Sequence, residues 1–251
     1  MNIINILLRN IKWRFQNPIS ILLTIIQPLL WLVLYSTIAG QFMKETMNVN
    51  YVSFILPGIM VLVTFSCCSS GGYINFIMKS KGSFQRILIS PVRRSDIVLG
   101  QIFEAVSLSI FEAFILVLIS LFFSVRIESG ILGILLLIVP IFFSAFFMAG
   151  ISYTISLKLP NEVIYETVMS LVILFLFFMS TALFPTENVS VFFRVLLTLN
   201  PFVYSINFLR SLILENTINW NSFFIMTIIF SVLCIIIFFV SVKTLEKQTD
   251  S

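Results

Sequence analysis

The sequence predicts an all-α integral membrane protein with six transmembrane helices. Hydrophobic residues make up 59% of the 251 residues and charged residues only 10%, a balance that leaves too little polar surface for a water-soluble domain. Apolar runs of about 20 residues recur six times, and a helix of that length crosses a hydrocarbon core of about 30 Å. We expect a single transmembrane domain over residues 1–251.

The first 17 residues predict a helix that lies in the headgroup plane. Polar side chains such as Arg9 and Lys12 fall on one helical stripe, and apolar ones such as Leu8 and Ile11 fall on another. A helix with this division, basic residues and Trp13 is typical of an interfacial segment. Residues 1–17 are therefore expected to lie on the membrane rather than to cross it.

Six apolar segments follow, and each is long enough to span the bilayer. The expected spans cover residues 19–39, 53–77, 97–123, 131–156, 164–184 and 223–242. If the N terminus is cytoplasmic, 11 of the 15 Lys and Arg residues fall on the inner side of this scheme. Because basic residues concentrate in cytoplasmic loops, this bias predicts that both termini face the cytoplasm. We expect a multi-pass protein of a plasma membrane.

Positive charge concentrates in the connection between the second and third spans, residues 79–96. Its cations are Lys79, Lys81, Arg86, Arg93 and Arg94. Between them, Phe84, Ile87 and Leu88 are three and four residues apart, the interval that places side chains on one helical face. Pro91 ends this short helix. The pattern predicts a cytoplasmic helix outside the bilayer that offers an apolar face, ringed by cations, to another protein.

The connection between the fifth and sixth spans, residues 185–222, is long and still largely apolar. It contains two short helical patterns, 189–199 and 202–214, separated by Asn200 and Pro201. The second, of about 13 residues, is too short to cross a bilayer. We interpret the pair as extracellular re-entrant or outer-leaflet helices, which protein must cover because their polar backbone ends are not shielded in lipid. The alternative is a seventh span, which would place the C terminus outside.

Glu104 and Glu112 are the ionisable residues deepest in an expected span. A carboxylate near mid-bilayer is costly and usually faces the interior of a bundle or a wet cavity. Eight residues correspond to about 80° of rotation, so both side chains share one broad face. They predict a contact for a cationic substrate or a proton site. Interhelical hydrogen bonds are the alternative, and the sequence leaves both open.

The chain lacks the residues that several kinds of catalytic and nucleotide-binding site require. It contains no His, no G-x-x-x-x-G-K-[ST] phosphate loop and no G-x-S-x-G elbow, so no catalytic residue is predicted. Its three Cys residues lie in apolar runs and are expected to be buried reduced thiols, with no metal site. The excess of cations lies in loops beside spans, which argues for membrane sorting and against nucleic acid as a partner.

Residues 85–100 resemble the cytoplasmic loop between the second and third spans of the ABC type 2 exporter permeases, the daunorubicin-resistance-permease-like group. Residues 199–204, with Arg210 downstream, are similar to the Asn-Pro and Arg pattern that precedes the last span in that family. Residues 182–185 resemble the break after its fifth span. The resemblance extends over nearly the whole chain.

This resemblance implies a half-transporter. Two permease subunits, identical or related, would pair, and two copies of a separate ATPase carrying ATP and Mg would dock from the cytoplasm. The loop would be the coupling helix that contacts the ATPase, through Gly82, Ser83, Phe84, Gln85, Arg86, Ile87, Leu88 and Pro91. The outer motif would be Pro185, Asn200, Pro201 and Arg210. The chain departs from the family at Lys79 and Lys81, where acidic residues are frequent.

The function expected from these observations is ATP-driven export of an amphiphile, such as a drug, a hydrophobic peptide or a lipid-like molecule, across a bacterial plasma membrane. Such export would confer multidrug resistance if the cargo is a drug. Two alternatives stay open. One is export of a polysaccharide or glycolipid on the same scaffold. The other is a proton-coupled secondary transporter that uses Glu104 and Glu112 without an ATPase.

Overall fold

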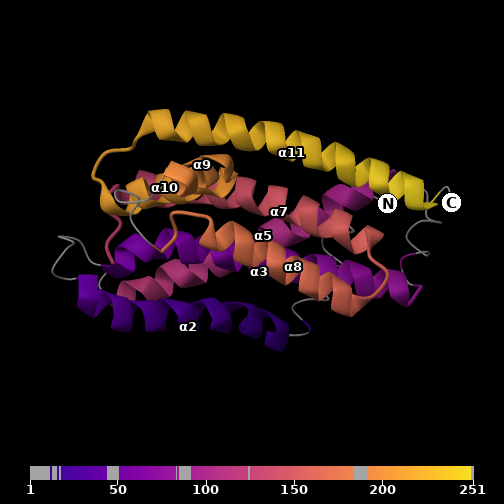
Figure 1. The fold of residues 1–251 in the computed structure, drawn as a ribbon, viewed down its shortest axis with the longest axis horizontal. Helices are drawn as coiled ribbons and strands as arrows, with labels where there is room; N and C mark the ends of the chain where they lie inside the picture. Colours follow the sequence, from indigo (N-terminus) through magenta and orange to yellow (C-terminus); the bar gives the residue numbers. More distant parts are fainter. Residues whose placement is uncertain are drawn as a thin grey trace.

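The computed structural model describes Lys12, Gln16, residues 18–43, 51–82, Phe84, and residues 92–123, 125–183 and 191–249. Within these residues the regular structure is helical, and no strand occurs among them. Figure 1 shows the long helices lying side by side along one axis, so that the bundle has two ends. The all-α prediction is confirmed for this part of the chain.

Six helices are long. They are α2 (Pro18–Met43), α3 (Tyr51–Ser80), α5 (Arg94–Ser120), α7 (Ile138–Lys158), α8 (Glu162–Phe178) and α11 (Trp220–Thr249). Four elements are short: the 3-10 turn η1 (Leu121–Phe123), α6 (Gly130–Leu136), α9 (Val191–Leu199) and α10 (Pro201–Leu214). The expected interfacial helix, residues 1–17, lies outside the described residues apart from Lys12 and Gln16.

Four segments of the described chain are long and apolar enough to cross a membrane: Tyr51–Ser80, Arg94–Phe123, Gly130–Lys158 and Trp220–Gln248. They match the second, third, fourth and sixth expected spans. The first expected span coincides with α2, whose described apolar stretch is Ile25–Leu34. The fifth coincides with α8, whose 17 residues fall short of the roughly 20 that a straight span needs. The full count of six spans therefore stays a prediction.

The fourth of these segments is interrupted near its start. α6 ends at Leu136 and α7 begins at Ile138, with Leu137 forming a turn between them. Pro140 lies four residues after Leu136 and has no backbone N–H, so it cannot donate the helical hydrogen bond to the Leu136 carbonyl. The break therefore follows from the proline. The apolar pattern had predicted one continuous helix over 131–156, and the break at Leu137 corrects this prediction.

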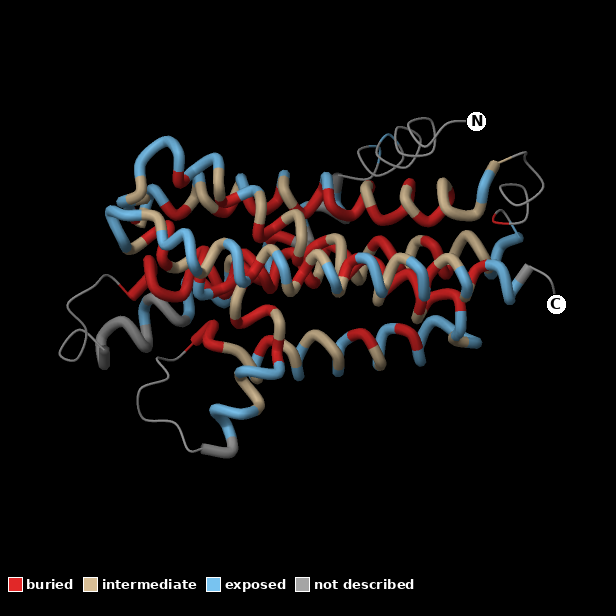
Figure 2. Tube along the Cα trace, turned by 90° about the horizontal axis from the view of Figure 1, so that it is seen from above, coloured by how far each residue is buried: buried red, intermediate tan, exposed pale blue. Residues whose placement is uncertain are grey.

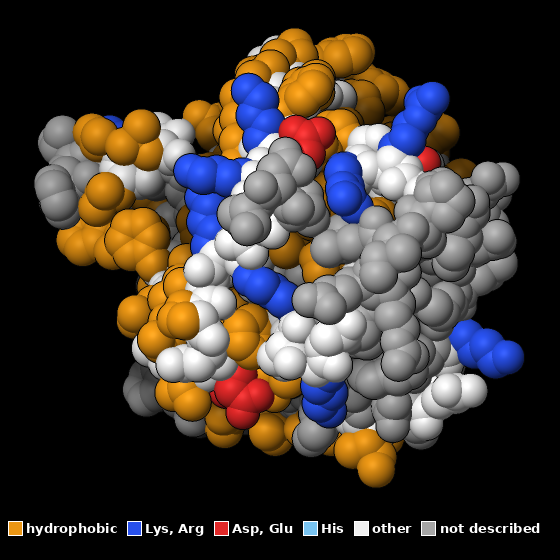
Figure 3. Space-filling view, turned by 90° about the vertical axis from the view of Figure 1, so that its right-hand side faces the viewer, with side chains coloured by type: hydrophobic (Ala, Val, Ile, Leu, Met, Phe, Trp, Pro, Cys, Tyr) orange, Lys and Arg blue, Asp and Glu red, His pale blue; other side chains and the backbone are white. Residues whose placement is uncertain are grey.

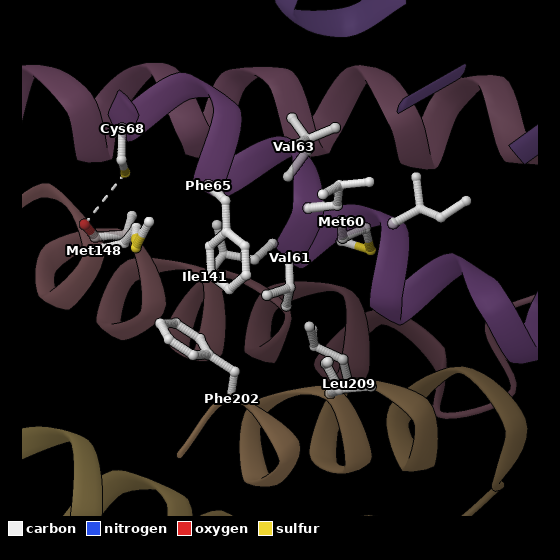
Figure 4. Packing of buried hydrophobic residues seen from close by; sticks show 14 of the residues in the cluster. Met60, Val61, Val63, Phe65, Cys68, Ile141, Met148, Phe202 and Leu209 are labelled. Carbon is white, nitrogen blue, oxygen red and sulfur yellow. Dashed lines mark hydrogen bonds between the residues drawn. The ribbon is translucent and has the colours of Figure 1, made fainter. Parts of the chain in front are cut away.

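α3 lies at the centre of the bundle and packs against α2, α5, α7, α8 and α10. In its most apolar stretch 89% of the residues are buried, against 17% in the corresponding stretch of α11. Figure 2 shows this contrast between the central and peripheral helices. The core around α3 is close-packed: the Phe65 ring meets the Phe202 ring of α10 edge to face with centroids 4.5 Å apart, and both rings appear in Figure 4. α3 is therefore the helix against which the others are positioned.

Small residues on α3 allow this close packing. At Gly72, a Cβ atom would lie 2.0 Å from the Ser152 Oγ of α7 and 2.4 Å from the Tyr165 hydroxyl of α8. Only glycine lets the three helices approach this closely, as is common where membrane helices meet. The Ser152 Oγ and the Tyr165 hydroxyl oxygen lie 2.8 Å apart.

Candidate functional site

The expected interruption at Asn200 and Pro201 is present, and its local chemistry explains it. Asn200 is the N-cap of α10, and its side-chain Oδ1 accepts a hydrogen bond of 3.1 Å from the Phe202 amide. Pro201 occupies the first turn, where a missing N–H costs nothing. The chain thus ends α9 and starts α10 at the two residues that the sequence singled out.

The other half of the Asn200 amide bonds a different helix. Its Nδ2 donates to the Leu176 carbonyl at 2.8 Å and to the Met179 carbonyl at 2.7 Å, and the side chain is 6% exposed. The last carbonyls of a helix have no intrahelical donor. Asn200 therefore caps the start of α10 and the end of α8 at once. The sequence had predicted an interruption at Asn200 and neither of these capping roles.

Arg210 completes the same arrangement from the far end of α10. Its guanidinium donates to the Thr181 carbonyl, to the Phe54 carbonyl at 3.2 Å and to the Asn207 Oδ1 at 3.4 Å. Its central carbon lies 3.9 Å from the centroid of the Phe54 ring, a cation–π contact. The side chain thus joins α10, α3 and the segment that follows α8. We call Asn200 and Arg210 together the carbonyl clamp; the remaining expected motif residue, Pro185, lies outside the described residues.

Glu104 and Glu112 are both inside the bundle, with 2% and 1% of their surfaces exposed. The α3 residues opposite them are known from two contacts: the Cys67 Sγ lies 3.7 Å from the Ala105 carbonyl, and the Cys68 Sγ lies 3.7 Å from the Ser109 Oγ. The interval between the two glutamates therefore faces the middle of α3. Their expected position on the interior face of the bundle is confirmed. Their role as substrate or proton sites stays a prediction.

A seam of small polar groups lies between α3, α7 and α8, and it was not among the sequence predictions. The Ser152 Oγ donates to the Cys68 carbonyl at 2.8 Å, and the Tyr165 hydroxyl donates to the Ser69 carbonyl at 2.7 Å. Further along, the Asn75 Nδ2 donates to the Ser156 Oγ at 2.7 Å. The seam fixes the positions of α3, α7 and α8 along the bundle axis. Serine and cysteine on apolar helices are the only signal in the sequence, and they do not show which helices pair.

Of the expected coupling-helix residues, Gly82 and Phe84 are described, and Ser83, Gln85, Arg86, Ile87, Leu88 and Pro91 lie outside the described residues. Gly82 adopts a φ of +72°, in the left-handed region, and ends the turn that follows α3. Phe84 is only 5% exposed and belongs to the apolar core of this chain. Its ring is therefore an internal anchor for the loop, and the expected outward-facing apolar surface does not include it.

The loop begins at an end of the bundle that is rich in cations. We call this end, where α3, α7 and α11 finish and α5 begins, the basic end; Figure 3 shows Lys and Arg side chains spread over it. Its described cations are Lys79, Lys81, Arg93, Arg94, Lys158, Lys243 and Lys247. At the opposite end the described cations are Arg126, Arg194 and Arg210. The Lys79 ammonium ties the basic end together, since it donates to the Leu157 carbonyl and, at 2.8 Å, to the Gln248 Oε1.

Among the described residues, no group of three or more His, Cys, Asp or Glu side chains is placed to hold a metal ion. Cys67, Cys68 and Cys234 are free and buried, which confirms the prediction of buried reduced thiols. The arrangement therefore offers a packed helical bundle, a clamp at one end, a basic loop at the other and two buried carboxyl groups between them.

Comparison with known proteins gives consistent matches over most of this chain. The family model of the ABC-2 type transporter matches residues 1–214. The transport permease ycf38 of Cyanophora paradoxa is 29% identical over 203 residues, covering 78% of this chain and 69% of that protein. The Porphyra purpurea protein of the same name is 30% identical over 219 residues, covering 83% and 71%. ABC transporter G family member 20 of Dictyostelium discoideum is 24% identical over 206 residues, covering 80% of this chain and 28% of that protein.

Proposed function

We propose, from the premise that this chain belongs to the ABC-2 type transporter family, that it is the permease of an ATP-driven exporter working with a separate ATPase. Family membership makes it a multi-pass permease component of an ABC transporter. In the proposed complex, the permease pairs with a second copy of itself or with a related chain. Two copies of the ATPase bind at the basic end. This arrangement places that end in the cytoplasm of a bacterial cell.

The observation that carries this proposal is the attachment of the basic loop to the core. Phe84 is buried within the chain, and Lys79 at the start of the loop bonds the ends of α7 and α11. A force applied to the loop by a docked ATPase would therefore reach several helices at once. A loop that only connected two spans would not need these contacts.

The proposed motion is a rigid-body shift. The loop leaves α3 and enters α5, and both helices pack against α7. Nucleotide-driven closure of the ATPase pair would displace the loop and shift α3 and α5 together, because packed helices move as units. The shift would open a path between the two permeases toward the opposite end. A mainly apolar interior suits an amphiphilic cargo, and polysaccharide or glycolipid cargo is the alternative on the same scaffold.

The orientation can be tested by labelling. In sealed cells, a cysteine introduced by Arg86→Cys should react with a membrane-impermeant maleimide only after permeabilisation, whereas Arg126→Cys, at the opposite end, should react at once. The three native thiols are buried and give little background. Labelling of Arg86→Cys in intact cells would place the loop outside and refute the proposed docking.

Docking itself can be tested with charge reversal. When the permease is co-expressed with its ATPase, Arg86→Glu should weaken the complex by at least about tenfold, because like charges facing each other across an interface cost several kcal/mol. Arg126→Glu is the matched control, an exposed arginine at the opposite end. Equal recovery of ATPase with both variants would contradict docking through this loop.

A proton-coupled carrier is the second candidate function, and the burial of Glu104 and Glu112 favours it. Buried carboxyl groups inside a membrane bundle frequently lie on proton or ion pathways. The purified chain alone, reconstituted in liposomes, separates the two candidates. Uptake driven by a pH gradient without any ATPase would support the carrier, and dependence on an ATPase and ATP would support the exporter.

A further inference from the structure

An apolar groove runs along the surface of the bundle between α8 and α11. Its volume is about 900 Å³, within the range of small-molecule sites. Phe147 and Ile151 of α7 form its floor, Val172 and Phe175 belong to the α8 wall, and Val232 belongs to the α11 wall. α8 and α11 stand apart here, each packing on α7. The groove is therefore formed within a single chain and is open toward the surroundings of the bundle.

One end of the groove is closed by the α9–α10 turn, and the two hydroxyl groups that line it donate their hydrogens within the protein. Tyr204 and Thr198 line it there. The Tyr204 hydroxyl donates to the Thr198 carbonyl at 3.3 Å, and the Thr198 Oγ1 donates to the Val195 carbonyl at 2.8 Å. Neither hydroxyl has a hydrogen left for an occupant, and the other lining residues are apolar, so an apolar occupant fits this closed end.

Toward the basic end, the same helical faces lead to lysines. Lys158 follows Ile151 by seven residues and Lys243 follows Val232 by eleven, intervals that return to nearly the same face of a helix. The Thr154 Oγ1 and the Ser241 Oγ, 2.9 Å apart, fix the register of α7 against α11, so both lysines lie at about the same height. Both side chains are exposed. Two cationic side chains therefore lie between the apolar groove and the basic end.

Acidic side chains at this end define where an anion would sit. Glu162 and Glu166 belong to the α8 side, and the Glu162 Oε2 accepts from the Tyr73 hydroxyl of α3 at 3.3 Å. The α7–α11 side carries one acidic residue, Glu246, and three basic residues, Lys158, Lys243 and Lys247. The net positive charge is therefore on the α7–α11 side, and an anionic group would be held there.

We propose that this groove holds one acyl chain of an anionic phospholipid from the leaflet at the basic end, with the phosphate at Lys158 and Lys243. The eleven residues from Lys243 to Val232 rise about 16 Å, close to half of a hydrocarbon core of about 30 Å. A chain anchored at the lysines therefore ends inside the groove.

The test uses the purified permease without ATPase or nucleotide, so its failure and the failure of the exporter proposal can be told apart. Delipidated protein in detergent is titrated with phosphatidylglycerol or phosphatidylcholine, and bound lipid is counted by native mass spectrometry. We expect one tightly bound phosphatidylglycerol per chain, preferred over phosphatidylcholine. Equal binding of the two lipids would overturn the proposal.

Two pairs of variants locate the bound lipid. Val232→Trp fills the groove and should abolish the tight site, whereas Ile235→Trp, similarly exposed on α11 but not lining the groove and turned away from the line between Val232 and Lys243, should retain it. The double variant Lys158→Gln/Lys243→Gln should weaken phosphatidylglycerol binding about 30-fold, or about 2 kcal/mol, and Lys81→Gln should not. If Val232→Trp leaves lipid binding unchanged and instead dissociates a dimer, the groove is a subunit interface and the proposal is wrong.

Discussion

Replacement of Arg210 by methionine tests the carbonyl clamp most directly. Methionine keeps most of the length and apolar stem of the side chain but removes every donor. The Thr181 and Ala182 carbonyls, which lie beyond the end of α8, then lose the guanidinium that bonds them, and the cation–π contact with Phe54 disappears. Three contacts would still hold the segment after α8. The Asn200 Nδ2 donates to the Met179 carbonyl, the Thr181 Oγ1 donates to the Asn207 Oδ1 at 2.8 Å, and the Tyr51 hydroxyl donates to the Leu183 carbonyl at 3.2 Å.

The expected loss follows from these contacts. A buried carbonyl left without a donor costs about 1–3 kcal/mol. The cation–π contact contributes about 1–2 kcal/mol more. Methionine recovers part of this loss, because it removes the cost of keeping a guanidinium partly out of water. We expect a net destabilisation of about 3 kcal/mol, which for a chain of this length lowers Tm by about 6–12 °C.

The chain carries its own reporters for the measurement. Cys67, Cys68 and Cys234 are buried, so a thiol-reactive fluorophore reports their exposure as the detergent-solubilised protein is heated. Arg194→Met is the matched control, because Arg194 is an exposed arginine of α9 at the same end of the bundle. Arg210→Lys should fall between wild type and Arg210→Met, since lysine keeps the charge but not the planar fork. A Tm for Arg210→Met within about 1 °C of the Arg194→Met value would refute the clamp.

Three further predictions concern the interior of the bundle. Gly72→Ala should destabilise the protein by about 1–3 kcal/mol through the clash with Ser152 and Tyr165; adding Tyr165→Phe should recover part of the Tm, and no recovery would mean that the hydroxyl is not the obstacle. Phe84→Ala should lower the free energy of unfolding by an amount typical of a core truncation, about 3 kcal/mol or more, and lower Tm with it, whereas an unchanged Tm with lost ATPase binding would show that the ring is a docking surface. Glu112→Gln should leave ATP-driven transport intact in an exporter, and abolished transport with a normal Tm would point to a required proton site.

Several local features of the fold could be predicted because residues adjacent in sequence produce them. The Asn200–Pro201 start of α10 follows from capping chemistry and the fixed φ of proline. The break at Leu137 follows equally from Pro140, although the sequence analysis treated that span as continuous. Apolar length alone indicated the four membrane-capable segments that the structure confirms.

The site residues show the limit of this reasoning. The sequence singled out Asn200 and Arg210 as a motif, but their partners are carbonyls 21 to 29 residues earlier in the chain and, for Phe54, 156 residues earlier. Phe84 was expected to face a partner because its neighbours share its helical face, yet it packs into the core. A spacing of three or four residues shows that side chains share a face, and it does not show what that face contacts.

By itself, the sequence determined where the helices form, where Asn200 and Pro201 separate two of them, and which connections carry the cations, because these depend on local backbone chemistry and on the cost of placing charge in lipid. The tertiary structure alone decided that α3 is central, that α8 ends under the carbonyl clamp and that a groove remains between α8 and α11. The physical reason is that these helices are apolar on every side. A helix without a polar face carries no signal in its sequence for which side packs, so shape and the few interhelical hydrogen bonds decide.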